Sequence, residues 1–178
     1  MEGLGIHFDI CIKEIDETYP ADLHWSKVPS YLCKRKADAF SGDEIGEGAV
    51  LITADTVVIL EEKVLGKPTD RDDAVRLLKE LSGKKHLVIT GVCLKTPHQE
   101  RVFDVTTEVW FRSFLDEEIE WYVDRFRPLD KAGAYGVQEW IGYVGIEHID
   151  GSFYNVMGLP TQRLYLELLK LIGDEEVG

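Results

Sequence analysis

Apolar and polar residues alternate along several stretches of the chain, and a period of two is typical of half-buried strands. The first such stretch has apolar side chains at positions 6, 8, 10 and 12. A hairpin is expected on either side of Asp150-Gly151, because this dipeptide is typical of tight turns. The other expected strands cover residues 49–54, 57–60, 86–95 and 102–111.

Other stretches repeat their apolar residues every three or four positions, which predicts amphipathic helices. Ser26 is expected to cap the first helix, which carries Pro29 in its first turn, where the missing N–H group does no harm. Thr69 or Asp70 is expected to cap the second helix. The expected helices cover residues 26–40, 70–83, 116–126 and 160–171, and loops are expected over 41–48 and 127–140.

Helical and strand patterns follow one another without strict alternation, which predicts an α/β or α+β fold with a sheet of mixed direction and flanking helices. The 178 residues suit a single domain, 1–178, or two tightly joined lobes around a cleft. A flexible tail is expected over residues 173–178. The cysteines at 11, 33 and 93 are odd in number and lack motif spacing, so we expect them to be reduced and structural.

The charge of the chain limits its partners. A net charge of −13 repels nucleic acid polymers, so we expect none as a partner. A pocket with a few lysines and a metal ion can still attract a small polyanion. Met1-Glu2-Gly3 does not begin a signal peptide, and Asp55 interrupts the most apolar region, residues 49–60, so we expect a cytoplasmic protein without membrane spans.

Asp55 is the first candidate for chemistry. An ionised carboxylate between two apolar strand segments is costly unless it is paired, bound to metal or open to solvent. A strand-end aspartate that caps a turn remains an equally good reading of its position. Glu17 lies in a loop and Lys36 on a helix, where charged residues are mostly just solvated. Lys67 is better placed, because Gly66 and Pro68 fix the backbone on either side of it.

The segment 130–138, DKAGAYGVQ, is a second candidate. Its small residues allow a ligand to approach the backbone closely, while Lys131 supplies a charge and Gln138 a group that both donates and accepts hydrogen bonds. A tight glycine turn with an exposed lysine is the alternative interpretation. The histidines show no metal-ligand spacing, and we find no nucleophile elbow, Walker A loop or dinucleotide fingerprint.

Several motifs occur together and in order, and at these spacings they are highly specific. They are IDE at 15–17, KADAF at 36–40, ADTVV at 54–58, GKP at 66–68, LSGKKHLVITGV at 81–92, DKAGAYGVQ at 130–138 and GSFYNVMGLP at 151–160. With them the chain resembles the Maf family over nearly its whole length. That resemblance implies a metal-dependent nucleoside triphosphate pyrophosphatase that is cytoplasmic and often dimeric. It also implies a mixed α/β fold with a cleft, similar to that of inosine triphosphate pyrophosphatases.

The resemblance also implies roles for individual residues. Asp55 matches the catalytic proton acceptor, and Glu17, Lys36 and Lys67 match residues that line the phosphate and metal site. Glu17 and Asp55 would hold a divalent cation, Mg²⁺ or Mn²⁺. Thr56 and Gln138 match positions that mark the branch acting on dTTP and UTP, and Lys131 of the same loop is expected to bind substrate. The expected reaction releases the nucleoside monophosphate and pyrophosphate, and the expected assembly is a homodimer.

The N-terminal segment departs from the family pattern. Relatives carry a serine–proline–arginine–arginine loop that grips phosphates before the segment that begins here at Met1, and residues 1–5 resemble the end of the first helix. We therefore expect either a start at an internal methionine or a site that has lost this loop. Two alternatives to dTTP/UTP hydrolysis stay open: the same reaction on modified nucleotides, and a non-catalytic role in septum formation.

Overall fold

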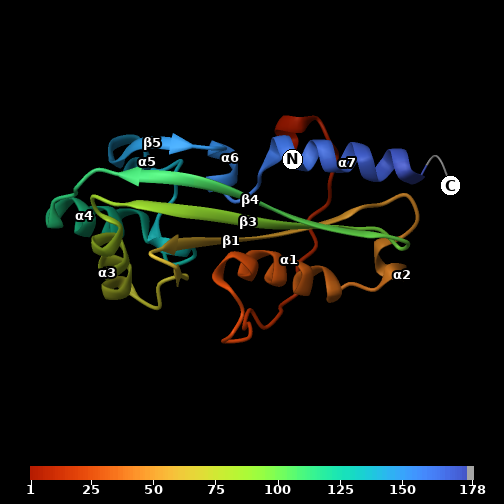
Figure 1. Ribbon diagram of the computed structural model, residues 1–178, viewed down its shortest axis with the longest axis horizontal. Helices are drawn as coiled ribbons and strands as arrows, with labels where there is room; N and C mark the ends of the chain where they lie inside the picture. Colours follow the sequence, from red (N-terminus) through yellow and green to blue (C-terminus); the bar gives the residue numbers. More distant parts are fainter. Residues whose placement is uncertain (176–178) are drawn as a thin grey trace. The chain divides into compact units, whose positions relative to one another are not determined.

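The computed structural model describes residues 1–175, except the side chains of Glu2, Asp174 and Glu175, and confirms an α/β fold (Figure 1). Its sheet has the order β2-β1-β3-β4-β5, and the pairs β1–β2 and β4–β5 are antiparallel. The strands are β1 (Leu51–Leu60), β2 (Lys63–Leu65), β3 (Lys85–Lys95), β4 (Glu100–Phe111) and β5 (Ile146–Asp150). The helices are η1 (Glu2–Leu4), η2 (Trp25–Lys27), α1 (Val28–Asp38), α2 (Gly42–Ile45), α3 (Arg71–Leu81), α4 (Asp116–Phe126), η3 (Ala132–Ala134), α5 (Trp140–Gly145), α6 (Phe153–Val156) and α7 (Thr161–Glu175).

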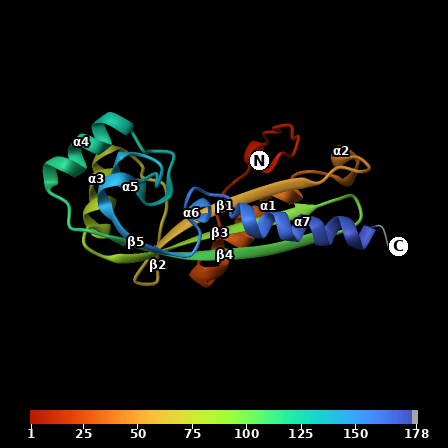
Figure 2. The ribbon, with the colours of Figure 1, turned by 90° about the horizontal axis from the view of Figure 1, so that it is seen from above.

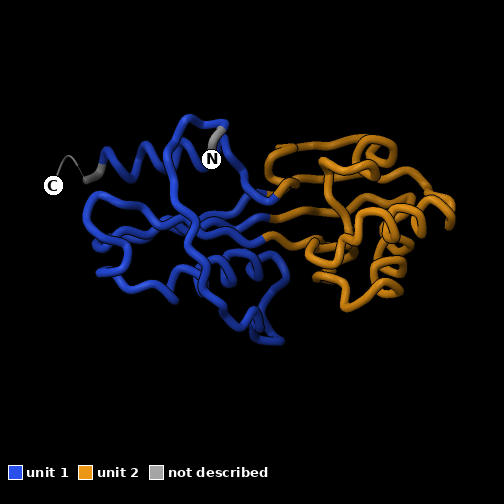
Figure 3. Tube along the Cα trace, turned by 180° about the vertical axis from the view of Figure 1, so that it is seen from behind, with its two compact units in different colours: residues 1–55, 90–105, 158–178 blue, residues 56–89, 106–157 orange. Residues whose placement is uncertain are grey.

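The chain divides into two compact units (Figure 3). Unit 1 comprises residues 1–55, 90–105 and 158–178, and unit 2 comprises residues 56–89 and 106–157. The strands β1, β3 and β4 each have residues in both units. The expectation of one domain with two lobes around a cleft stays a prediction. Among residues 1–175, no helix has the length and apolarity that crossing a bilayer requires.

In unit 1, α1 and α7 cover opposite faces of the strands (Figures 1 and 2). Successive side chains of a strand point to opposite faces, so β3 supplies both layers. Val92 and Leu94 are buried against α7, in a cluster with Leu164, Leu168 and Leu171. Between them, Cys93 is buried on the α1 face, in a cluster with Cys33 and Ala37.

Gly91 determines how closely α1 approaches the sheet. A Cβ atom at this position would lie 2.4 Å from the carbonyl carbon of Pro29, in the first turn of α1. The absence of a side chain therefore lets the helix backbone lie directly on β3. A second contact ties α1 to β1, because the Thr53 hydroxyl group donates a hydrogen bond to the Cys33 carbonyl oxygen at 2.6 Å.

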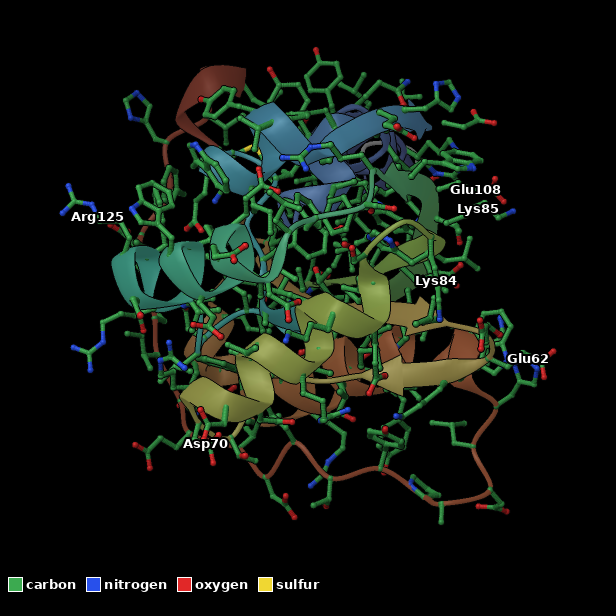
Figure 4. The ribbon with its side chains drawn as sticks, turned by 90° about the vertical axis from the view of Figure 1, so that its left-hand side faces the viewer. Glu62, Asp70, Lys84, Lys85, Glu108 and Arg125 are labelled. Atoms are coloured by element: carbon green, nitrogen blue, oxygen red, sulfur yellow. The ribbon has the colours of Figure 1, made fainter. Side chains whose placement is uncertain are left out.

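In unit 2, α3 and α4 pack together over a core that includes Leu78, Phe111 and Tyr122. Asp70 caps α3 as predicted, because its carboxylate accepts a hydrogen bond from the Asp73 N–H group at 2.8 Å. Charged residues lie on the outside of this unit (Figure 4). Among them, Lys85 of β3 and Glu108 of β4 form an ion pair of 3.2 Å.

The strand predicted over residues 6–12 is wrong. These residues form no regular element, and Phe8, Ile10 and Ile12 are exposed by 44%, 79% and 87%. Alternation predicts a strand only where one face is buried and a neighbour accepts the hydrogen bonds. Here only Ile6 packs against the core, and the apolar side chains at 8, 10 and 12 face solvent.

Two helix boundaries and one hairpin also differ from the prediction. Lys27, not Ser26, is the N-cap of α1, and Ser26 belongs to the 3₁₀ turn η2, where its N–H group donates to the His24 side chain. Pro29 does lie in the first turn of α1. The hairpin predicted around Asp150-Gly151 is wrong, because β5 is followed by α6 rather than by a second strand. The last helix, α7, runs to Glu175, inside the segment predicted as a tail, while residues 176–178 lie outside the described residues.

We expect Gly91→Ala to lower the free energy of unfolding by about 1–3 kcal/mol, the usual cost of overpacking a closely packed site. The backbone of α1 must move away from β3 to admit the methyl group. Thermal unfolding followed by circular dichroism measures this change. The control is Gly173→Ala in α7, where nothing lies within 4 Å and alanine favours the helix. Equal melting temperatures for Gly91→Ala and wild type would contradict the packing argument.

Candidate functional site

The carboxylate of Asp55 is largely withdrawn from solvent and paired with the ammonium group of Lys36. Its side chain is 11% exposed, and its Oδ1 atom lies 2.5 Å from Lys36 Nζ. Lys36 Nζ also lies 3.4 Å from the carbonyl oxygen of Ala54. The close packing of α1 on the sheet brings the two charges together, since Lys36 lies on α1 and Asp55 on β1. The interruption of the apolar run at Asp55 is thus explained by a pairing that offsets its desolvation.

Glu17 supplies a second carboxylate to the same lysine, at 3.1 Å from Lys36 Nζ. Its segment is held in place on both sides of the residue. The neighbouring Asp16 accepts hydrogen bonds from the N–H and hydroxyl groups of Thr18, at 2.9 and 2.7 Å. Arg35 of α1 donates to the Thr18 carbonyl oxygen at 2.7 Å. The loop carboxylate is therefore attached to the helix that carries Lys36.

The three groups place one amino group between two carboxyl groups. Burial lowers the pKa of Lys36. The hydrogen bonds and charges of Asp55, and then of Glu17, raise it by more, so the pKa of Lys36 lies above its usual value. The lysine therefore remains an ammonium ion between the two carboxyl groups. In the described part of the chain, no group of three His, Cys, Asp or Glu side chains is arranged to hold a metal ion. The two carboxylates nevertheless suit Mg²⁺ or Mn²⁺, because such hard ions are often held by one or two carboxylates together with substrate phosphates.

The segments that carry Lys67 and Lys131 are joined within unit 2. The N–H group of Gly133 donates to the carbonyl oxygen of Gly66 at 3.0 Å. Gly133 has φ +67°, and a Cβ atom there would lie 2.9 Å from the side chain of Val58, so glycine permits this close approach. The GKP segment and the loop 130–138 therefore lie side by side.

Lys131 is paired with two carboxylates. Its Nζ atom lies 2.8 Å from Asp130 Oδ1 and 3.3 Å from Glu139 Oε1. The hydrogen bond from Lys131 lowers the pKa of Asp130, and the charge of Lys67 adds a smaller contribution in the same direction. Glu139 also accepts a hydrogen bond from the hydroxyl group of Tyr122.

Tyr122 and Glu139 were missed by the sequence analysis. Tyr122 is one of the apolar positions of an amphipathic helix, and Glu139 directly follows the loop motif. Neither residue type nor spacing indicates that two such residues, 17 positions apart, meet through a hydrogen bond. No signal in the sequence alone would have found this pair.

The predicted site residues thus fall into two groups. The structure brings Glu17, Lys36 and Asp55 together in unit 1. In unit 2 the loop of Lys131 also carries Gln138, which is exposed, while Thr56 is half-buried on β1 and begins the unit directly after Asp55. Lys67 is exposed beside the Lys131 loop.

The chain is similar to known proteins over nearly its whole length. The family described as "Maf-like protein" matches residues 1–171. A dTTP/UTP pyrophosphatase of Bacteroides thetaiotaomicron is 52% identical over 172 residues, which are 96% of this chain and 89% of the relative. One of Porphyromonas gingivalis is 50% identical over 170 residues, or 94% of this chain and 85% of the relative. A third, of Flavobacterium psychrophilum, is 46% identical over 168 residues, or 94% and 86%.

The family match covers far more than half of the sequence, and the relatives are similar over nearly the whole chain. The motifs found in the sequence lie within the matched residues. This chain belongs to the Maf family.

Proposed function

We propose that the chain is a nucleoside triphosphate pyrophosphatase that hydrolyses dTTP and UTP to the monophosphate and pyrophosphate. The observation that carries the proposal is the largely buried Asp55 carboxylate, paired with Lys36 beside Glu17 in a chain of the Maf family. Relatives that are about half identical to it are named dTTP/UTP pyrophosphatases. Pyrophosphate released from UTP, detected as phosphate only after an inorganic pyrophosphatase is added, tests the reaction.

In this proposal Asp55 is the proton acceptor. A water molecule attacks the α-phosphorus, a new P–O bond forms, and the bond to the bridging oxygen between the α and β phosphates breaks. The pyrophosphate leaves with the electron pair of that bond, and the water proton passes to Asp55. Lys36 supports this role, because its 2.5 Å contact with one carboxylate oxygen orients the group.

Cations are needed because negative charge accumulates on the phosphoryl oxygens. Glu17 and Asp55 would hold Mg²⁺ or Mn²⁺, which when bound neutralises phosphate charge and makes water more acidic. Lys36, Lys67 and Lys131 would act as point charges on the phosphates. The ammonium groups of Lys36 and Lys131 stay protonated, which supports that role.

Base recognition is assigned to Gln138 and Thr56. The amide group of glutamine both donates and accepts hydrogen bonds, which suits the O4 acceptor and N3 donor of thymine and uracil. Gln138 is exposed on its loop, so its amide group is accessible to a ligand. The same two positions mark the dTTP/UTP branch in the resemblance described above.

The comparisons favour hydrolysis of dTTP and UTP over a purely regulatory role, since the relatives are named as enzymes. The proposal also includes a homodimer in the cytoplasm that binds no nucleic acid polymer. The net charge of −13 supports the last point. Light scattering coupled to gel filtration tests the dimer.

Asp55→Asn is expected to lower kcat for UTP by at least about 100-fold, because a positioned general base contributes roughly 10²–10⁴-fold. The two side chains have nearly the same shape, so the far-ultraviolet circular dichroism spectrum should not change. Asp22→Asn, at an exposed loop aspartate, is the matched control and should keep wild-type activity. A kcat within tenfold of wild type would show that Asp55 is not the base.

Removal of divalent ions with EDTA is expected to stop turnover, and added Mg²⁺ or Mn²⁺ should restore it. Glu17→Gln should raise the Mg²⁺ concentration at half-maximal rate by about 10-fold, since one charged ligand is lost while Asp55 remains. Titration of the rate with Mg²⁺ measures this change. An unchanged midpoint in Glu17→Gln would remove Glu17 from the metal site.

The chain is expected to prefer UTP to 7-methyl-GTP by about 5- to 150-fold in kcat/KM, because an amide left unpaired by the wrong base costs roughly 1–3 kcal/mol. Gln138→Leu should reduce that ratio toward one. Competition between the two nucleotides in one reaction measures the ratio directly. A preference for the methylated purine would overturn the assignment of the base.

A further inference from the structure

Tyr122 of α4 is fully buried, and its hydroxyl group serves two residues of the loop that follows the helix. The oxygen accepts a hydrogen bond from the Gly136 N–H group at 3.2 Å, and the hydroxyl donates one to Glu139 Oε2. Phe126 stacks on the Tyr122 ring, with the ring centroids 5.1 Å apart. The hydroxyl group is therefore fixed by α4 and not by the loop that it binds.

Glu139 transmits this contact to Lys131. One carboxylate oxygen accepts from Tyr122, and the other lies 3.3 Å from Lys131 Nζ. Glu139 is the N-cap residue of α5, yet its side chain makes no capping hydrogen bond to that helix. It turns back over Gly136 instead, where a Cβ atom would lie 2.9 Å from the Glu139 carboxyl carbon. The contact therefore leaves α5 without a side-chain cap from Glu139, and it leaves no room for a side chain at position 136.

Tyr122 stays a neutral phenol and Lys131 stays an ammonium ion, as the contact with Glu139 requires. Burial, followed by the hydrogen bond to Glu139, raises the pKa of Tyr122, so the phenol remains a donor at neutral pH. Burial lowers the pKa of Lys131, but the hydrogen bond and charge of Asp130 and Glu139 outweigh it and raise the pKa. The Lys131 side chain is 24% exposed, so its ammonium group can still meet a ligand.

We propose that Tyr122 and Glu139 are positioning residues that hold Lys131 and Gln138 for nucleotide binding. The inference rests on the proposed function and assigns it two further residues. The proposal includes Gln138 because Tyr122 binds residues on both sides of it. The Tyr122 hydroxyl group contacts the Gly136 N–H group two residues before Gln138 and the Glu139 carboxylate directly after it. Tyr122 is fully buried, so it acts through the loop and not by contact with a nucleotide.

A purely structural role makes a different prediction. Loss of a buried hydrogen bond would then lower stability without changing how nucleotides are bound or discriminated. The two roles are separated by Tyr122→Phe, which keeps the stacked ring and removes only the hydroxyl group. We expect kcat/KM for UTP to fall by about 10-fold, the effect of one hydrogen bond to a charged group, mainly through KM. The ratio of kcat/KM for UTP to that for CTP should fall as well, because Gln138 loses its fixed orientation.

The matched control is Tyr143→Phe on α5, where the tyrosine is 80% exposed. This variant should keep the wild-type kcat, KM and UTP-to-CTP ratio. Glu139→Gln serves as a second variant, because it can still accept from Tyr122 but no longer carries a charge for Lys131. It should raise KM for UTP as Tyr122→Phe does while leaving the melting temperature closer to wild type.

A double-mutant cycle with Lys131→Met gives the decisive measurement. If Tyr122 acts through Lys131, Tyr122→Phe should lower kcat/KM for UTP by less in the Lys131→Met background than in wild type, because only the part exerted through Gln138 remains. Additive losses would overturn the proposal, as would an unchanged kcat/KM in both Tyr122→Phe and Glu139→Gln. A wild-type chain that releases no pyrophosphate from UTP or dTTP would refute the proposed function and this role with it. An active wild type with additive losses would refute the positioning role alone.

Discussion

The constraint behind unit 1 is the cost of burying the Asp55 carboxylate in an apolar strand. A cation that reaches the strand offsets this cost, and Lys36 on α1 supplies it. That reach requires the helix to lie almost on the sheet, which Gly91 permits and the hydrogen bond from Thr53 to Cys33 secures. The ion pair therefore depends on the close packing of α1 on β3, and that packing depends on the glycine at position 91.

Unit 2 holds a charged side chain, that of Lys131, by hydrogen bonds to its loop. Lys131 lies on a loop, and a loop side chain is mobile unless other groups hold it. Here the backbone bond between Gly133 and Gly66 fixes one part of the loop, and Tyr122 fixes another from the adjoining helix. The backbone around Lys131 is therefore held by hydrogen bonds to other segments, although it belongs to no helix or strand.

The sequence indicated these features to very different degrees. Asp55 stood out because a charge interrupts an apolar run, and Asp70 because capping follows a local rule that needs no knowledge of the rest of the fold. The strand expected over residues 6–12 failed because alternation says nothing about whether a neighbouring strand exists. The contact between Tyr122 and Glu139 was beyond prediction, since it depends on how a helix and a loop pack together.

The contact between Gly91 and Pro29 is steric, and it has a consequence for behaviour in salt. Dissolved ions screen charges at the surface, but they do not weaken the packing of two backbones. Lys36 therefore keeps its place on α1 in dilute and in concentrated salt. A chain of net charge −13 and a triphosphate repel each other at long range, and ions shield that repulsion. Moderate ionic strength accordingly weakens this long-range repulsion and leaves the packing of α1 on β3 unchanged.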